Sequence, residues 1–163
     1  SKKRLERLSE NLARTGLSAQ VAQADLRQWQ PDAPVDAILL DAPCTATGIY
    51  RRHPDVLHRI GPRQIEELAQ LQGELLDRAA GWVRPGGRIA YATCSLEQAE
   101  GEDRINHFLK THGDFALEPA DPAILPRGIA PTAQGWIRTL PDCLADEGGT
   151  DGFFIALLAR APN

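Results

Sequence analysis

The stretch VDAILLDAPC at residues 35–44 and the similarly built RIAYATCS at residues 88–95 decide the fold of this chain. In each, an apolar run typical of a buried parallel strand leads into a polar segment that contains a cysteine. Between them, residues 63–84 carry apolar side chains at helical spacing, and Pro85-Gly86-Gly87 marks the end of that helix. Parallel strands joined by a crossover helix end at the same edge of a sheet, where open α/β sheets place their ligands and chemistry.

The rest of the chain continues the alternation of strands and helices. The expected strand at residues 35–40 is apolar enough to be buried on both faces. The order of elements predicts an α/β fold with a mostly parallel sheet and helices packed on its faces. The long connection at residues 45–62 is typical of a functional loop. The other predicted elements are a helix at 2–15, a short strand at 21–24, a helix opened by a capping box of Ser95 and Gln98, a weak strand at 115–117 and a buried strand at 153–159.

Composition indicates a single globular domain in a reducing environment. The chain has 163 residues, with 42% hydrophobic and 25% charged residues. It contains no apolar run long enough for a membrane span and no signal-peptide pattern, and its three cysteines do not form a disulfide framework. We therefore expect a cytoplasmic location. The net charge of −4 argues against a domain that binds phosphates through its overall charge, so any nucleic-acid surface must be local or lie elsewhere.

Cys94 and Cys44 are the first candidates for chemistry. A thiolate is a strong nucleophile when it is partly exposed in an electropositive setting, such as the segment between a parallel strand and the next helix. Cys94 lies in such a segment, and Cys44 is expected at the same edge. The alternative is that both are small buried apolar residues, as cysteines often are. Cys143 lies in the irregular region between residues 118 and 149, and a structural role is expected for it.

Two aspartates follow strands of the predicted sheet. Asp41 could be a general acid, a hydrogen-bonding group for a heterocycle or a metal ligand, and the absence of CxxC and HxxxH spacing argues against the metal. Asp25 could bind a ligand amine. A turn or a helix cap is the common alternative for either residue.

Arg51, Arg52 and His53 form the tightest basic cluster outside the first helix, in the long loop over the expected site. Such a cluster suits a phosphate backbone. A solvated loop with local ion pairs is an equally good interpretation of the pattern.

These residues resemble a known family. Residues 41–48, DAPCTATG, are similar to the DAPCSGTG motif of the RNA 5-methylcytosine methyltransferases, and Thr93-Cys94-Ser95 is similar to the second cysteine motif of that family. The match covers nearly the whole chain, and the two motifs in this order are highly specific. Three further segments narrow it to the RsmB (Sun/Fmu) type, which modifies a cytosine of bacterial small-subunit ribosomal RNA: RRHPD at 51–55, LAQLQ at 68–72 and TDGFF at 150–154.

The resemblance implies a Rossmann-like class I fold dependent on S-adenosylmethionine and a role for each candidate residue. Cys94 would add to C6 of the cytosine, Asp41 would hold the base at N3, and Cys44 would assist release of the product. Asp25 would bind the cofactor near its adenine end, and Asp41 and Pro43 would also contact the cofactor. The basic cluster at 51–53 would bind RNA, and no metal is expected.

The chain departs from the family at its beginning. It contains no glycine-rich strand–loop–helix signature for the cofactor and no amino-terminal RNA-binding domain. We therefore expect residues 1–163 to be the carboxyl-terminal part of one methyltransferase catalytic domain that lacks the first two strands. Alone, it should be inactive, bind the cofactor weakly or not at all, and self-associate through an exposed edge at the 35–40 strand.

Three other functions stay open at this point. The chain could be a non-catalytic module that binds RNA or protein and retains the fold. It could be an amino-methyltransferase, although that class is typified by an Asn-Pro-Pro-aromatic motif where this chain has DAPC. A thiol redox or metal protein is disfavoured because no two cysteines are close in sequence.

Overall fold

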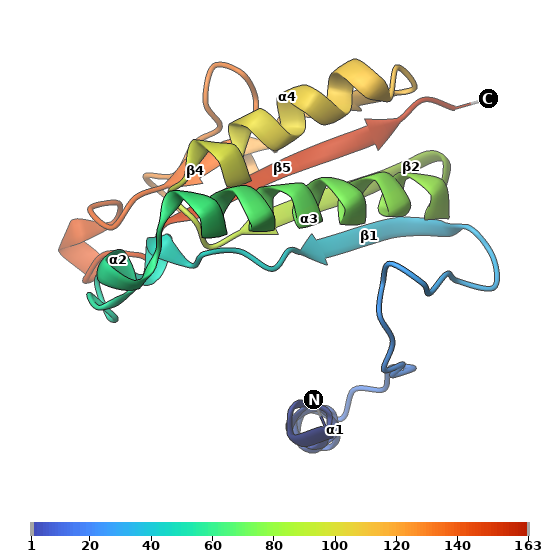
Figure 1. Ribbon diagram of the computed structural model, residues 1–163, viewed down its shortest axis with the longest axis horizontal. Coiled ribbons are helices and arrows are strands. Elements are labelled where there is room, and N and C mark those ends of the chain that lie inside the picture. Colours follow the sequence, from blue (N-terminus) through green and yellow to red (C-terminus); the bar gives the residue numbers. More distant parts are fainter. Residues whose placement is uncertain (1, 163) are drawn as a thin grey trace.

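The structure is a computed structural model that describes residues 2–162 (Figure 1). Short 3-10 helices connect the longer elements: η1 (Thr47–Ile49), η2 (Gln98–Glu100), η3 (Pro122–Ile124) and η4 (Ala145–Glu147). The helices and strands, in chain order, are α1 (Lys2–Thr15), β1 (Val35–Asp41), α2 (Val56–Arg59), α3 (Pro62–Trp82), β2 (Val83–Thr93), α4 (Glu102–Thr111), β3 (Phe115–Leu117), β4 (Ile137–Thr139) and β5 (Phe153–Arg160).

The five strands form one mixed sheet in the order β1-β2-β5-β3, and β4 pairs with β5. β1 and β2 are parallel, as expected, whereas β2, β3 and β4 all pair with β5 in the antiparallel direction. The α/β class is therefore confirmed, but the sheet described here is mixed rather than mostly parallel. The physical reason is that the chain returns to the carboxyl end of β2 before β5 begins, with Phe154 beside Thr93.

One face of the sheet is covered by α3 and α4, which run alongside each other over β2 and β5 (Figure 1). Apolar side chains from these helices and from the sheet form a single core. Its most deeply buried large members are Leu76 of α3, Ile105 and Phe108 of α4, Ile89 and Tyr91 of β2, and Phe154 and Leu158 of β5.

β1 is an edge strand, and the prediction that it is buried on both faces is wrong for this structure. Leu40 lies under α3 and is 6% exposed, whereas Leu39 on the opposite face is 74% exposed. The reason is that, within residues 2–162, β2 is the strand paired with β1 and α3 is the helix that packs on it, from the side of Leu40.

The amino-terminal part confirms one prediction and corrects another. The predicted helix at 2–15 is α1, which ends before Gly16 with its positive φ of 68° and stands apart from the sheet (Figure 1). The predicted strand at 21–24 is absent, because a strand needs a hydrogen-bonded neighbour and these exposed residues have none among those described. None of the helices within residues 2–162 has the length and apolar character required to cross a bilayer.

The predicted capping box after β2 is also wrong. α4 begins at Glu102, with the buried Gly101 before it, and Ser95 makes no cap to this helix. The Ser95 hydroxyl instead donates a hydrogen bond of 2.5 Å to the carboxylate of Glu100. A cap motif and a buried hydrogen bond use the same residue types, so the sequence pattern does not separate them.

Candidate active site

Parallel pairing brings the two cysteine segments together at one end of the sheet. Asp41 at the end of β1 is in register with Ala92 of β2, and the backbone N–H of Ala42 extends the ladder with a 3.0 Å bond to the Ala92 carbonyl. Cys44 and Cys94 therefore leave the sheet side by side, and their Sγ atoms are 3.4 Å apart. Both thiols are free and half-buried.

The two thiols have opposite acidities. The hydrogen bond from the Cys44 thiol lowers the pKa of Cys94 to about 7, against burial and the negative charges of Asp41 and Glu100, which raise it. The same bond, together with burial, raises the pKa of Cys44 well above its ordinary value. Cys94 is thus the thiol that ionises more readily near neutral pH, while Cys44 keeps its proton. The pair can supply a nucleophile and a proton donor at adjacent positions.

A close contact of two glycines holds the loops around the cysteines. The Gly48 N–H donates to the carbonyl of Cys94 at 3.0 Å, and the Gly152 N–H donates to the carbonyl of Gly48 at 2.8 Å. A Cβ atom added at Gly48 would lie 2.0 Å from the Gly152 carbonyl oxygen. Only a residue without a side chain allows this approach.

We expect Gly48→Ala to destabilise the fold by at least about 3 kcal/mol, because the methyl group overlaps backbone atoms that cannot rotate away. Chemical denaturation of the variant and the parent protein measures this difference. Gly81→Ala is the matched control: nothing lies within 4 Å of its added Cβ, so its stability should match the parent or rise slightly. Equal stability of both variants would contradict the prediction.

Arg138 of β4 fixes the backbone directly after Cys94. Its guanidinium donates to the Ser95 carbonyl at 2.6 Å, pairs with Glu102 at 2.5 Å and lies 4.9 Å from the ring centroid of Phe154. The ion pair is mostly buried, so solvent screens it less than a surface pair. β4 thereby connects the irregular region to the Cys94 loop.

The remaining predicted site residues are not all gathered at this edge. Asp41 and Pro43 are exposed at the end of β1, beside the cysteines. Asp25 instead accepts hydrogen bonds from the backbone and side chain of Arg27, an ion pair that lowers the pKa of its carboxyl group. It lies in an exposed turn without a strand before it, as the alternative interpretation of this residue held.

The basic cluster lies in the loop between η1 and α2. Arg51 and His53 are exposed. Arg52 is also exposed, but it forms an ion pair with Asp151, which lies next to Gly152 in the chain. The segments 51–55 and 150–154 are therefore in contact. Within residues 2–162 no group of three or more His, Cys, Asp or Glu side chains is arranged to hold a metal ion.

Comparison with known proteins shows the family of this chain. The sequence model of the family described as 16S rRNA methyltransferase RsmB/F matches residues 1–159. The chain belongs to this RsmB/F family. It is 40% identical over 164 residues to ribosomal RNA small subunit methyltransferase B of Shewanella oneidensis, covering 99% of this chain and 36% of that protein. The protein of the same name from Salmonella arizonae is 43% identical over 160 residues, covering 96% and 34%.

Solved structures place this RsmB/F chain among methyltransferase folds. The NSun6 structure from Pyrococcus horikoshii, determined with SFG, has a TM-score of 0.82 and 31% identity, covering 100% of this chain and 40% of that one. A methyltransferase homologue from the same organism has a TM-score of 0.75 and 29% identity, covering 98% and 51%. The chain spans about a third of the length of the curated relatives.

The structure also shows site residues of the RsmB/F chain that the sequence analysis missed. Glu100 contacts the cysteine loops through a buried hydrogen bond, and Gln72 and Arg138 contact them through partly buried ones. One signal was available for Gln72: it lies three and four residues before Leu75 and Leu76 on the apolar face of α3. A polar residue on a buried helix face needs a partner.

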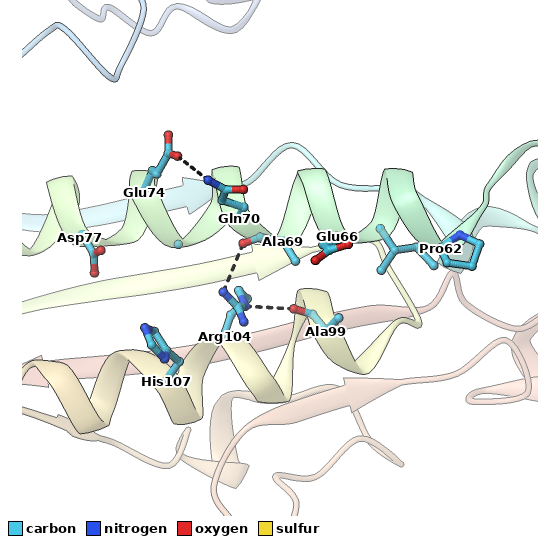
Figure 2. Close-up of a pocket in the computed structure, with 11 residues that line it drawn as sticks. Pro62, Glu66, Ala69, Gln70, Glu74, Asp77, Ala99, Arg104 and His107 are labelled. Atoms are coloured by element: carbon cyan, nitrogen blue, oxygen red, sulfur yellow. Dashed lines mark hydrogen bonds between the residues drawn. The ribbon is translucent and has the colours of Figure 1, made fainter.

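A separate groove of about 610 Å³ lies between α3 and α4 (Figure 2). Arg104 crosses its floor, where the guanidinium donates to the Ala69 and Ala99 carbonyls at 3.4 and 3.1 Å. Glu66, Glu74 and Asp77 lie along the α3 side (Figure 2). Neither cysteine lines the groove, so it is not part of the candidate active site.

Proposed function

We propose that residues 1–163 are the carboxyl-terminal part of a catalytic domain that transfers a methyl group from S-adenosylmethionine to C5 of a cytosine in small-subunit ribosomal RNA. Membership of the RsmB/F family and the names of its relatives support this substrate class. The observation that carries the chemistry is the pair of thiols 3.4 Å apart with unlike acidities. Methylation of an exocyclic amine needs no such pair.

Each candidate residue has a defined task in this reaction. C5 of a free cytosine is too weak a nucleophile to attack the methyl group of S-adenosylmethionine directly. The Cys94 thiolate adds to C6, which pushes an electron pair toward C5 and N3, while a proton held between the Asp41 carboxyl group and N3 offsets the negative charge that develops there. After methylation the C5 proton passes to a water molecule and the electron pair of the C5–H bond forms the C5=C6 double bond. The Cys94–C6 bond then breaks and the sulfur leaves with that bond's electrons. Cys44, which holds a proton beside this sulfur, assists the departure.

S-adenosylmethionine supplies an electrophilic methyl group on a sulfonium. The exposed carboxylate of Asp41 fits a hydrogen-bond donor of this cofactor, and the exposed Pro43 ring fits an apolar part of it. Asp25 can contribute only if its ion pair with Arg27 opens. This supports our expectation that residues 1–163 alone bind the cofactor weakly or not at all.

The loop at residues 51–53 is the part of the site that we assign to RNA. Arg51 and His53 are exposed, and no acidic group within residues 2–162 forms a hydrogen bond or ion pair with them, so both are available to phosphate oxygens. Arg52 forms an ion pair with Asp151, so we assign it two tasks: it binds RNA with its neighbours and it positions this loop. The target base must leave its stack to reach Cys94.

The test is methyl transfer from labelled cofactor to small-subunit ribosomal RNA, followed by nucleoside analysis. The full-length gene product should give 5-methylcytosine, whereas residues 1–163 alone should give no labelled nucleoside. Label on an exocyclic amine, or RNA binding without transfer by the full-length gene product, would overturn the proposal.

We also propose that residues 1–163 alone self-associate. The outer face of β1 exposes Leu39, and the edge strand presents unpaired backbone groups that favour pairing with another strand. Sedimentation velocity should show dimers or larger species whose share increases with protein concentration. A single monomeric species at high concentration would contradict this expectation. Leu39→Lys should shift the distribution toward monomer, because a charge on an edge opposes pairing.

A further inference from the structure

A fully buried carboxylate lies directly beneath the two cysteine loops. Glu100 of η2 is 0% exposed. Burial of a carboxylate is unfavourable unless hydrogen-bond donors replace the lost water. Its Oε1 atom accepts from the backbone N–H of Thr45 at 3.0 Å and from Nε2 of Gln72 at 2.8 Å. Its Oε2 atom accepts from the hydroxyls of Ser95, at 2.5 Å, and Thr45.

The donors come from the residues that follow each cysteine. Thr45 comes directly after Cys44, and Ser95 directly after Cys94. The hydroxyls of Thr45 and Ser95 are also 3.2 Å from each other, so the carboxylate and both hydroxyls form one cluster. Because Glu100 binds the two segments at the same time, it joins loops that are 50 residues apart in the chain.

α3 and β2 hold the carboxylate in place. Gln72 of α3 donates both to Glu100 and to the carbonyl of Pro43, each at 2.8 Å, so it fixes the segment before Cys44 as well. The Tyr91 hydroxyl of β2 donates to the backbone carbonyl of Glu100 at 2.8 Å. Side-chain rotation of Glu100 would break several of these bonds together, which makes the cluster rigid.

We propose that Glu100 is the positioning residue that sets the separation of the two sulfur atoms, by drawing the loops of Cys44 and Cys94 onto one buried carboxylate. It contacts neither the base nor the cofactor and acts through Thr45 and Ser95. The inference rests on the proposed function, since the separation matters for catalysis only if both thiols act on one bound base.

Removal of the Glu100 charge would change the pKa of Cys94 in two ways, and the two changes have opposite signs. The groups that influence the acidity of Cys94 are Cys44 and Asp41 from the β1 side and Glu100 from η2. The charge of Glu100 raises the pKa of Cys94, so its loss alone would lower this pKa. If Glu100 positions the loops, however, its loss separates the sulfurs, weakens the hydrogen bond from Cys44 and raises the pKa of Cys94.

The experiment uses Glu100→Gln in the full-length gene product. The amide presents a donor where the loops already present donors, so the cluster cannot re-form unchanged. The rate of iodoacetamide alkylation is followed against pH by mass spectrometry of the Cys94 peptide. We expect the midpoint of this rate-against-pH curve to move from near pH 7 toward the ordinary pKa of a cysteine thiol. Alkylation of Cys94 at pH 7 should then be slowed about tenfold. The turnover number of methyl transfer should fall while the KM for RNA stays unchanged.

A lower or unchanged midpoint in a folded Glu100→Gln protein would overturn the proposal. If that variant does not fold, Thr45→Val replaces it: this change removes one hydroxyl donor, keeps the side-chain shape and should move the midpoint in the same direction by less. An unchanged midpoint in folded Thr45→Val would then overturn it. Asp103→Asn, an exposed change near the start of α4, is the control and should leave alkylation unchanged. Because alkylation needs neither RNA nor cofactor, absence of methyl transfer in the parent protein is a separate result that concerns the proposed function alone.

Discussion

Cys94→Ala in the full-length gene product is expected to abolish methyl transfer, with a loss of at least about a thousandfold in turnover. The proposed reaction depends on an electron pair that reaches C5 only after a thiolate has added to C6. Cys44 is a poor replacement, because burial still raises the pKa of its thiol after the contact with Cys94 is lost. The measurement is labelled methyl incorporation into small-subunit ribosomal RNA under single-turnover conditions.

Cys143→Ala is the matched control for this loss. Cys143 is also a half-buried free thiol, but it lies in the turn after β4, where its sulfur accepts a hydrogen bond from the Leu140 N–H. We expect this variant to retain the parent rate. Retention of more than about a tenth of the activity by Cys94→Ala would show that the reaction does not pass through a bond to this sulfur.

The sequence predicts the centre of the fold well, because the decisive signals there are local. The apolar runs of β1 and β2 and the amphipathic pattern of α3 each contain enough residues to define an element. The rule that parallel strands end at one edge then places Cys44 beside Cys94 without further information.

Strand direction and strand partners are not local, and the sequence analysis predicted them correctly only for the pair β1 and β2. The direction of β5 depends on how residues 118–149 return the chain, and that region has no periodic pattern. β4 is too short, at three residues, to show one. The apolar segment 21–24 has strand-like composition, but no strand lies beside it among the described residues.

Glu100 shows why part of the site could not be predicted. In the sequence it is an acidic residue just before an amphipathic helix, a position where acids usually stabilise the helix and remain solvated. Its burial depends on three segments that meet only after folding: the loop at Thr45, the face of α3 at Gln72, and the turn at Ser95. No local pattern contains that information.

Cys44→Ala in the full-length gene product is expected to trap the enzyme on its RNA. Release of the product requires the Cys94–C6 bond to break, and the departing sulfur must be stabilised as it takes the electrons. In the structure the group that does this is the Cys44 thiol at 3.4 Å, whose hydrogen bond lowers the pKa of Cys94 to about 7. Without it Cys94 becomes more basic and leaves more slowly. We expect turnover to fall at least about a hundredfold and a covalent protein–RNA complex to accumulate.

Denaturing electrophoresis with labelled RNA and cofactor detects this complex. The double variant Cys44→Ala, Cys94→Ala should show none, which identifies the sulfur that forms the bond. Cys44→Ser should accumulate less than Cys44→Ala, because a hydroxyl can still donate a hydrogen bond to the departing sulfur. The complex should also form faster as pH is raised, since Cys94 without its partner needs more alkaline conditions to become a thiolate. If Cys44→Ala turns over at the parent rate without accumulation, neither the second thiol nor its 3.4 Å contact with Cys94 controls release, and the prediction is wrong.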